Sequence, residues 1–280
     1  MTDGNWVEVG DGVLARRYAE LDLTVGLVLG DGQCLVIDTR GDAVQGAELA
    51  AAVRQITPDP CTVAITHAHF DHAYGTVAFK SETFDGTAVW AHYGCHTDLA
   101  EDGADSLLKW EQRYRREGRA DVADALAATE LVLPGHLVRD ETRLSIGGRE
   151  VVLAHFGPAH TEHDLVVQVP DAAVVFAGDL VENGTGGEFT AESFGSDSTL
   201  SGWPAALEAI LALRPRIVVP GHGDPVGPEF VEARLGTVRT LAGLEAAVEA
   251  GELTVEAALA RSPLPEQITR AALAGVSPVR

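Results

Sequence analysis

The stretch Thr66-His67-Ala68-His69-Phe70-Asp71-His72 follows directly after the apolar, β-type run at 61–65. Imidazole nitrogens and carboxylate oxygens are the ligands that zinc and related divalent metals take in proteins. In an extended segment His67 and His69 point to the same side, because side chains alternate with a period of two, so both can reach one metal. Asp71 and His72 come after the chain has begun to turn and can address a second metal beside the first.

The alternative reading of this stretch is a polar loop with scattered histidines. Imidazoles this close together would repel one another on protonation, and they would have no packing role. We therefore favour a metal site at the end of a strand.

Three later side chains repeat the pattern of an apolar, strand-like run followed by a metal-binding group: His160, Asp179 and His222. Each has a small residue or a proline beside it, which lets the backbone come close to a crowded centre. Each signal is weak alone, since a lone histidine is more often a hydrogen-bonded loop residue. Together with the first motif, and in this order, they predict one site assembled from distant parts of the chain.

The composition limits the kinds of protein this chain can be. It has 280 residues, 46% of them apolar, which suits a sizeable core. The net charge of −22 argues against a nucleic-acid partner or an anionic membrane, because both are polyanions. Cys34, Cys61 and Cys95 form no CxxC pair, so we expect buried thiols rather than disulfides or a thiolate zinc site. The lack of a basic start, an apolar leader or a membrane-length apolar run predicts a cytoplasmic protein. We expect its partner to be a small-molecule substrate. The oligomeric state stays open, with a homodimer as one option.

Apolar periodicity and turn signals predict an alternating order of strands and helices. Gly30-Asp31-Gly32 is a hairpin signal between two apolar runs. No linker rich in Pro, Gly or Ser separates independent units, so we expect one domain over residues 1–280. The expected strands lie at 6–17, 25–38, 61–65, 88–91, 143–146, 150–155, 165–169, 173–176 and 217–219, and the expected helices at 43–56, 73–80, 203–213, 229–250, 255–261 and 266–273.

The segment from about 97 to 130 is charged, aromatic-bearing and helical in pattern, and we expect it to be an insertion. Trp110 and Tyr114, four residues apart, share one helical face. Either they pack this helix onto the body, or the helix forms a lid over the metal site. His92 follows a strand on the side where the site should lie, so Trp110, Tyr114 and His92 are the candidates for substrate contact. We expect a structural role for His155 and a solvated or locally hydrogen-bonded ring for His163.

These motifs resemble the metallo-β-lactamase superfamily, whose signature is HxHxDH, a later His in a Gly-rich segment, an Asp after a strand and a GHxD-like His. The resemblance covers roughly residues 13–230. It implies an α/β fold of four layers, an αββα sandwich of two mixed sheets with the metals at one edge, carrying the insertion and a helical C-terminal tail at about 229–280. It also implies that His67, His69 and His160 hold a first metal and Asp71, His72 and His222 a second, with Asp179 bridging them.

Such a constellation implies hydrolysis. Two divalent cations held about 3.5–4 Å apart lower the pKa of a shared water to near neutrality, which yields a metal-bridging hydroxide. Asp71 would orient that water and pass a proton to the departing atom. We therefore expect a dinuclear zinc enzyme, with two Zn²⁺ per chain and iron or manganese as alternatives, that cleaves a small ester, thioester or lactone. The chain has no GxSxG motif and no GxxxxGK[ST] loop.

Two departures separate the chain from the β-lactamases proper that it resembles. Asp179 stands where some of those enzymes have a cysteine ligand. Glu182 stands where they carry the lysine that binds the carboxylate of the β-lactam. A glutamate would repel an anionic β-lactam. A β-lactamase-like amide hydrolase is therefore the runner-up, and Asp179 instead matches the glyoxalase-II-like thioesterases and lactonases.

Other functions stay open at this level. A mononuclear iron, persulfide-dioxygenase-like enzyme would use only His67, His160 and Asp179, so the metal content separates it from a zinc hydrolase. A non-catalytic binding protein is disfavoured by the intact ligand set, and a nuclease by the acidic balance. Arg113, Arg115 and Arg116 are either a solvated helix face or contacts for an anionic substrate.

Overall fold

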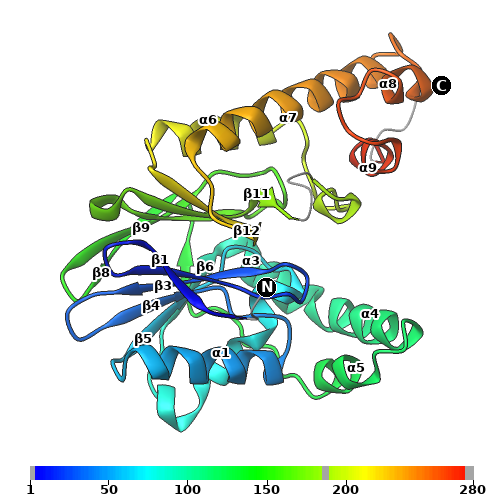
Figure 1. Cartoon of the computed structure of the whole chain (residues 1–280). Helices are drawn as coiled ribbons and strands as arrows, with labels where there is room; N and C mark the ends of the chain where they lie inside the picture. Colours follow the sequence, from blue (N-terminus) through cyan, green and yellow to red (C-terminus); the bar gives the residue numbers. More distant parts are fainter. Residues whose placement is uncertain (1–3, 185–188, 275–280) are drawn as a thin grey trace.

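Two β-sheets lie face to face in the computed structural model, which describes residues 4–184 and 189–274 (Figure 1). Both sheets are mixed, because their hairpins pair antiparallel while β4, β5, β6 and β7, like β11 and β12, run parallel. The first sheet has the order β1 (Trp6–Gly10), β2 (Val13–Arg17), β3 (Thr24–Leu29), β4 (Cys34–Ile37), β5 (Cys61–Ala64), β6 (Val89–His92) and β7 (His136–Val138). The second has the order β12 (Ile217–Gly223), β11 (Val174–Asn183), β10 (Leu165–Val169), β9 (Arg149–His155) and β8 (Glu141–Ile146).

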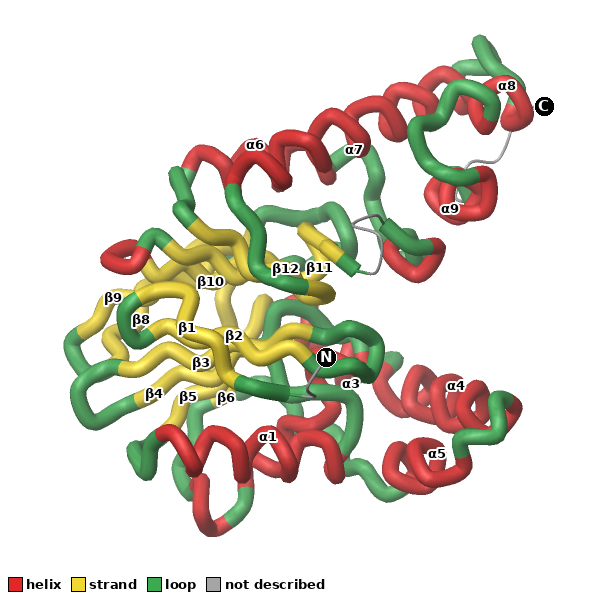
Figure 2. Tube along the Cα trace, viewed as in Figure 1, coloured by secondary structure: helices red, strands yellow, loops and turns green. Residues whose placement is uncertain are grey.

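Helices cover the outer face of each sheet. Helix α1 (Ala43–Ile56) lies on the first sheet, and α6 (Trp203–Ala212) and α7 (Pro228–Glu249) lie on the second (Figure 2). The chain ends in α8 (Val255–Leu259) and α9 (Glu266–Ala272). The predicted αββα sandwich with a helical C-terminal region is confirmed.

Strand β4 shows how the sequence builds these layers. All four of its residues are buried, because helices or the opposite sheet cover both of its faces. Leu35 and Ile37 join the cluster between the sheets, while Val36 packs on the helix side with Leu49 of α1. The apolar run is therefore continuous rather than alternating, as expected for a strand buried on both sides.

Helix α1 starts and stops where its sequence requires. The Asp42 carboxylate accepts hydrogen bonds from the backbone N–H groups of Val44 and Gln45, both at 2.8 Å, which caps the helix. Thr57 ends it directly before Pro58, as the residue before a proline disfavours helical backbone.

The segment expected to be an insertion is helical, with α3 (Tyr93–Glu101), α4 (Gly103–Arg116) and α5 (Ala120–Ala127), so its helices begin four residues earlier than the pattern indicated. The chain then returns through β7, which sequence analysis missed. This strand is three residues long with two of them exposed, so it shows no apolar alternation. It exists through pairing with β6, where the Trp90 and His136 rings stack at 4.7 Å.

Two strands run further than their apolar residues predicted. Strand β11 continues to Asn183 and β12 to Gly223, so Asp179 and His222 lie within strands rather than after them. The two strands stay paired through these polar residues, with an irregular register on both sides of Gly178. Backbone pairing of this kind leaves no apolar pattern in the sequence.

The described helices include none with both the length and the apolar character needed to span a bilayer.

Candidate metal centre

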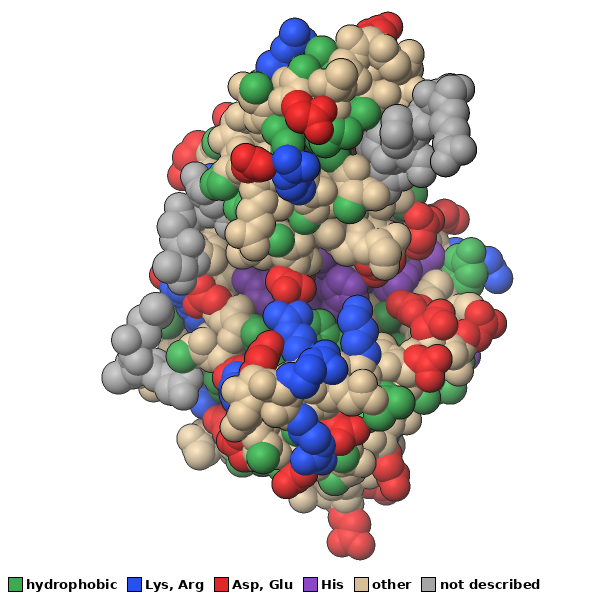
Figure 3. Space-filling model, turned by 90° about the vertical axis from the view of Figure 1, so that its right-hand side faces the viewer, with side chains coloured by type: hydrophobic (Ala, Val, Ile, Leu, Met, Phe, Trp, Pro, Cys, Tyr) green, Lys and Arg blue, Asp and Glu red, His purple; other side chains and the backbone are tan. Residues whose placement is uncertain are grey.

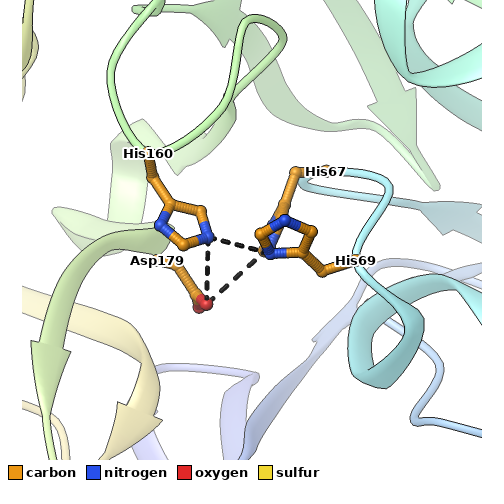
Figure 4. A group of neighbouring side chains, drawn as sticks. All are labelled: His67, His69, His160 and Asp179. Carbon is orange, nitrogen blue, oxygen red and sulfur yellow. Dashed lines mark hydrogen bonds and ion pairs between the residues drawn. The ribbon is translucent and has the colours of Figure 1, made fainter. Parts of the chain in front are cut away.

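The seven predicted ligands meet at one edge of the sandwich in two adjoining groups. Within each group the ligand atoms lie within 4.8 Å of one another: His67, His69, His160 and Asp179 form one group, and Asp71, His72 and His222 the other. Figure 4 shows the first group, with the rings and the carboxylate pointing toward a common centre. The centre joins the loop after β5 and the short helix α2 (Phe70–Ala73) that follows it, the loop after β9, and strands β11 and β12.

Asp179 lies between the two groups. One of its oxygens, Oδ2, is 3.5 Å from His160 Nε2 and 3.1 Å from His222 Nε2. The other, Oδ1, is 3.2 Å from His72 Nε2. Its carboxylate therefore contacts ligands of both groups, which is the placement a bridging ligand requires.

All five histidines hold their outer ring nitrogen in a hydrogen bond to a fixed oxygen. Carboxylate and carbonyl oxygens only accept, and Thr66 already donates its hydroxyl to Asp38 at 2.8 Å, so the proton of each ring lies on that outer nitrogen. The inner nitrogen of every ring is left with a lone pair directed at the centre. The partners are Thr66 Oγ1 for His67 (3.0 Å), Asp197 Oδ2 for His69 (3.0 Å), Asp38 Oδ2 for His72 (2.8 Å), Ser193 O for His160 (3.0 Å) and Leu21 O for His222 (2.8 Å).

Where the rings are neutral, the inner nitrogens face one another as lone pairs. His160 Nε2 lies 3.0 Å from His69 Nδ1, and His72 Nε2 lies 3.4 Å from His222 Nε2. Facing lone pairs repel, and a cation between them would remove the conflict. His67 Nε2 and Asp179 Oδ1 are buried without a hydrogen-bond partner in the described part of the chain. The residues present thus fit a divalent metal, and imidazole and carboxylate without thiolate fit zinc.

The ionisation of the cluster agrees with cation binding. Burial, followed by the neighbouring His72, lowers the pKa of His67 well below its usual value, and burial lowers the pKa of His160 to about 4. Burial opposes a charge on Asp179, but His222 and the other rings outweigh it and hold the Asp179 pKa well below its usual value. Burial likewise opposes a charge on His222, but Asp179 outweighs it and raises the His222 pKa to about 10. A metal would have to displace that proton from His222.

Glycines allow the backbone to approach this centre, as predicted for the small residues beside the ligands. A Cβ on Gly221 would lie 1.9 Å from Asp179 Oδ1. Gly178 has a φ of +52°, and a Cβ there would lie 2.9 Å from Thr66 Cβ. Neither position can carry a side chain without moving a ligand or the strand that holds it.

A cavity of about 1230 Å³ opens onto the centre. In Figure 3 histidine side chains lie in a hollow between two parts of the surface, with acidic and basic side chains along its edges. Trp110 and Tyr114 line the cavity, and the Trp110 ring lies 4.2 Å from that of Phe70, inside the metal-binding stretch. Helix α4 thus packs on the metal-binding stretch at 66–72 and forms one wall of the cavity.

The other histidines lie outside the two ligand groups, although His163 lines the cavity. His92 is buried, stacks on His155 at 4.1 Å and accepts the N–H of Gly94 at the start of α3, and it is not among the described residues that line the cavity. His163, for which we expected a solvated or locally bonded ring, is buried and accepts the N–H of the distant Ala68 at 3.1 Å. That expectation was wrong, because a contact between residues this far apart leaves no local signal.

Sequence analysis also missed the side chains that orient the ligands. Asp38 carried a usable signal, since it is a carboxylate at the end of a buried strand on the same sheet edge as the first motif. Asp197 and Ser193 carried none, because they lie in an irregular segment remote from every motif.

A sequence model of the metallo-β-lactamase superfamily matches residues 21–222, more than half of the chain. The chain belongs to the metallo-β-lactamase superfamily. Membership confirms the resemblance of its motifs and supports an enzyme of the metallo-hydrolase type.

Two curated superfamily members are similar over part of the chain. A metallo-β-lactamase type 2 of Bacteroides fragilis is 30% identical over 128 residues, 44% of this chain and 48% of that protein. A linear primary-alkylsulfatase of Pseudomonas sp. (strain ATCC 19151) is 24% identical over 233 residues, 73% of this chain and 42% of that protein. The matched part of the chain thus spans less than half the length of either relative.

Solved structures share the fold. A sec-alkylsulfatase from Pseudomonas sp. superposes with a TM-score of 0.75 at 17% identity, over 96% of this chain and 50% of that one. A metallo-β-lactamase from Pontibacter korlensis superposes with a TM-score of 0.63 at 19% identity, over 85% of this chain and 99% of that one.

Proposed function

We propose that this chain is a dinuclear zinc hydrolase that cleaves a small ester, thioester or lactone. The observation that supports it most is that all five rings bind an oxygen through the outer nitrogen, which leaves the inner nitrogens directed at the centre and open to a metal once it displaces any proton held there. His67, His69 and His160 would hold one zinc and Asp71, His72 and His222 the other, with Asp179 between them. Iron or manganese would accept the same ligands.

When bound, such a pair of cations supplies a hydroxide nucleophile at neutral pH and positive charge for the substrate's carbonyl oxygen. Asp71 lines the cavity, and its Oδ2 lies 3.5 Å from His222 Nε2. Its carboxylate is therefore placed to orient the attacking water and to pass a proton to the departing atom. Trp110 and Tyr114 would hold the apolar part of the substrate and exclude water.

A β-lactamase-like activity is the second candidate, since one relative carries that name. Glu182 counts against it. This side chain is buried, lines the cavity and accepts a hydrogen bond from Ser193 Oγ at 2.7 Å. Where a β-lactam carboxylate would need a cation, the cavity offers an acid.

A sulfate ester hydrolase is the third candidate, because a relative is an alkylsulfatase. Its reaction would again use the metal pair and Asp71. An iron dioxygenase is less well supported, since it would leave the group of Asp71, His72 and His222 without a role.

The test is a screen of the zinc-restored protein against a neutral thioester, a lactone, an alkyl sulfate and a chromogenic cephalosporin. We expect the thioester or the lactone to be the best substrate. Asp71→Ala should lower kcat by about 10²–10⁴-fold with an unchanged circular dichroism spectrum. Asp31→Ala, in an exposed hairpin turn, is the matched control. Full activity in the Asp71 variant would remove the proposed role of this carboxylate.

A further inference from the structure

The walls of the cavity are strongly acidic beyond the metal centre. Among the described residues that line it, nine carboxylates other than Asp71 and Asp179 face three cations, so the space above the centre carries a large negative charge. The cavity also reaches the buried Asp179, whose Oδ1 has no hydrogen-bond partner among the residues that the structure describes.

The cations in the lining balance only part of this charge, because Arg113 pairs with two of the nine carboxylates and Arg119 pairs with a carboxylate that is not among the described lining residues. Arg113 binds Glu117 and Glu192, each at 3.0 Å. Arg119 binds Glu20 at 2.7 and 2.9 Å. The third, Lys109, is exposed on helix α4.

Four further acids of the lining, none of which pairs with these arginines, form what we call the acidic wall: Asp98, Glu101, Asp102 and Asp197. Asp197 Oδ2 is hydrogen-bonded to the proposed ligand His69 at 3.0 Å, so the acidic wall begins directly beside the metal centre. Burial, and then the charges of Asp197 and Asp102, raise the pKa of Asp98. Asp98, which is half-buried, is therefore repelled by Asp197 and Asp102.

The His163 ring, which lies close to Asp98, cannot act as its counter-ion. His163 Nε2 lies 3.8 Å from Asp98 Oδ2, but this nitrogen accepts the backbone N–H of Ala68. Protonation would break that bond, and burial lowers the pKa of His163 to about 3. His163 is thus neutral, and the acidic wall has no internal cation from it.

We propose that the substrate carries a positive charge, as an ammonium or quaternary ammonium group, a few bonds from the ester or thioester that is cleaved, and that the acidic wall receives this charge. The inference rests on the proposed function and names the substrate class of the same site. A substrate cation would relieve the mutual repulsion of these carboxylates, whereas a carboxylate or sulfate would add to it.

The experiment compares three thioesters of similar size with the zinc-loaded full chain. Acetylthiocholine carries the cation, S-(3,3-dimethylbutyl) thioacetate replaces its nitrogen by carbon, and S-acetyl-3-mercaptopropionate carries an anion. We expect kcat/KM to be at least about tenfold higher for acetylthiocholine than for the neutral compound at low salt, and lowest for the anion. The preference should shrink as ionic strength rises. Equal or higher kcat/KM for the neutral compound would overturn the inference.

Variants locate the effect. Asp98→Asn should reduce the preference to about threefold, and Asp102→Asn is the second variant should the first fold poorly. Asp31→Asn removes the same charge outside the cavity and should leave the preference unchanged. An equal reduction in Asp31→Asn would show a general effect of net charge and would contradict the role of the acidic wall.

A binding measurement separates this inference from the proposed function. Calorimetry with the zinc-loaded protein compares choline with 3,3-dimethylbutan-1-ol. If no ester, thioester or lactone is cleaved but choline binds more tightly in a manner that depends on Asp98, the proposed function fails and the charge preference stands. If both alcohols bind equally, the charge preference fails whatever the activity.

Discussion

Asp38 Oδ2 accepts a hydrogen bond from His72 Nδ1 at 2.8 Å. The same carboxylate accepts the backbone N–H and the hydroxyl of Thr66, each at 2.8 Å, so it fixes both ends of the metal-binding stretch. One strand-end residue thereby orients His72 directly and His67 through Thr66.

Asp38→Asn should therefore weaken metal binding. An amide cannot accept all three bonds, and its NH₂ group would face the N–H of His72 or the hydroxyl of Thr66. Loss of such an orienting partner costs about 10–100-fold in metal affinity. Competition with a chromogenic chelator measures this, with Asp59→Asn at the far end of strand β5 as control. Wild-type zinc affinity in Asp38→Asn would show that the carboxylate does not position the rings.

Gly221→Ala should weaken metal binding although it replaces none of the proposed ligands. Its methyl group would lie 1.9 Å from Asp179 Oδ1, so the carboxylate that contacts both groups must move. We expect zinc affinity to fall by at least about tenfold, with activity lost in parallel. Gly236→Ala, at an open position in α7, is the matched control, since a Cβ there meets no atom within 4 Å. A Gly221→Ala protein that keeps two metals would place Asp179 outside the centre.

Trp110→Ala should raise KM about tenfold while the metal content stays the same. The indole lines the cavity and packs on Phe70, so its loss opens the wall that would hold the substrate. Leu108→Ala on the same helix is the control, because this side chain is 48% exposed and is not among the described lining residues. Equal KM values for the two variants would assign Trp110 to packing alone.

His92→Asn should reduce the loss of folding stability that the protein shows as the pH falls below 6.5. Burial, and then His155, lower the pKa of His92 to about 4, from an unfolded value of 6.5. Between these values the unfolded chain binds a proton that the folded chain does not, so folding stability is complete above pH 6.5 and falls as the pH drops toward 4. Asparagine keeps an acceptor for Gly94 but does not titrate.

Urea unfolding at pH 7 and pH 4.5 would measure this effect. The wild type should lose on the order of 1–2 kcal/mol more than His92→Asn between these pH values. Activity at pH 7 should be nearly unchanged, since the ring lies away from the cavity lining. A large loss of activity would indicate that His92 contributes to substrate binding after all.

The sequence predicted which candidate ligands come together better than it predicted their surroundings. His67, His69 and Asp71 could be found because one short segment holds them in a spacing that metals require. Asp179 and His222 could be found only in combination, and their strands proved longer because backbone pairing continues past the apolar residues. The partners Asp197 and Leu21 could not be found, since the contacts of Asp197 with His69 and of Leu21 with His222 depend on how distant loops meet.

The insertion shows the same limit. Its helices followed from composition and periodicity, and Trp110 and Tyr114 were correctly placed on one face. Periodicity could not tell whether that face packs or lines a cavity, and the structure shows that Trp110 does both.

The most direct test of the central claim is the metal content of the purified protein, measured by mass spectrometry together with turnover as zinc is added back to the chelated protein. We predict two zinc ions per chain, with turnover reaching its maximum only when the second is bound. One iron per chain, or full turnover with no metal bound, would contradict the account.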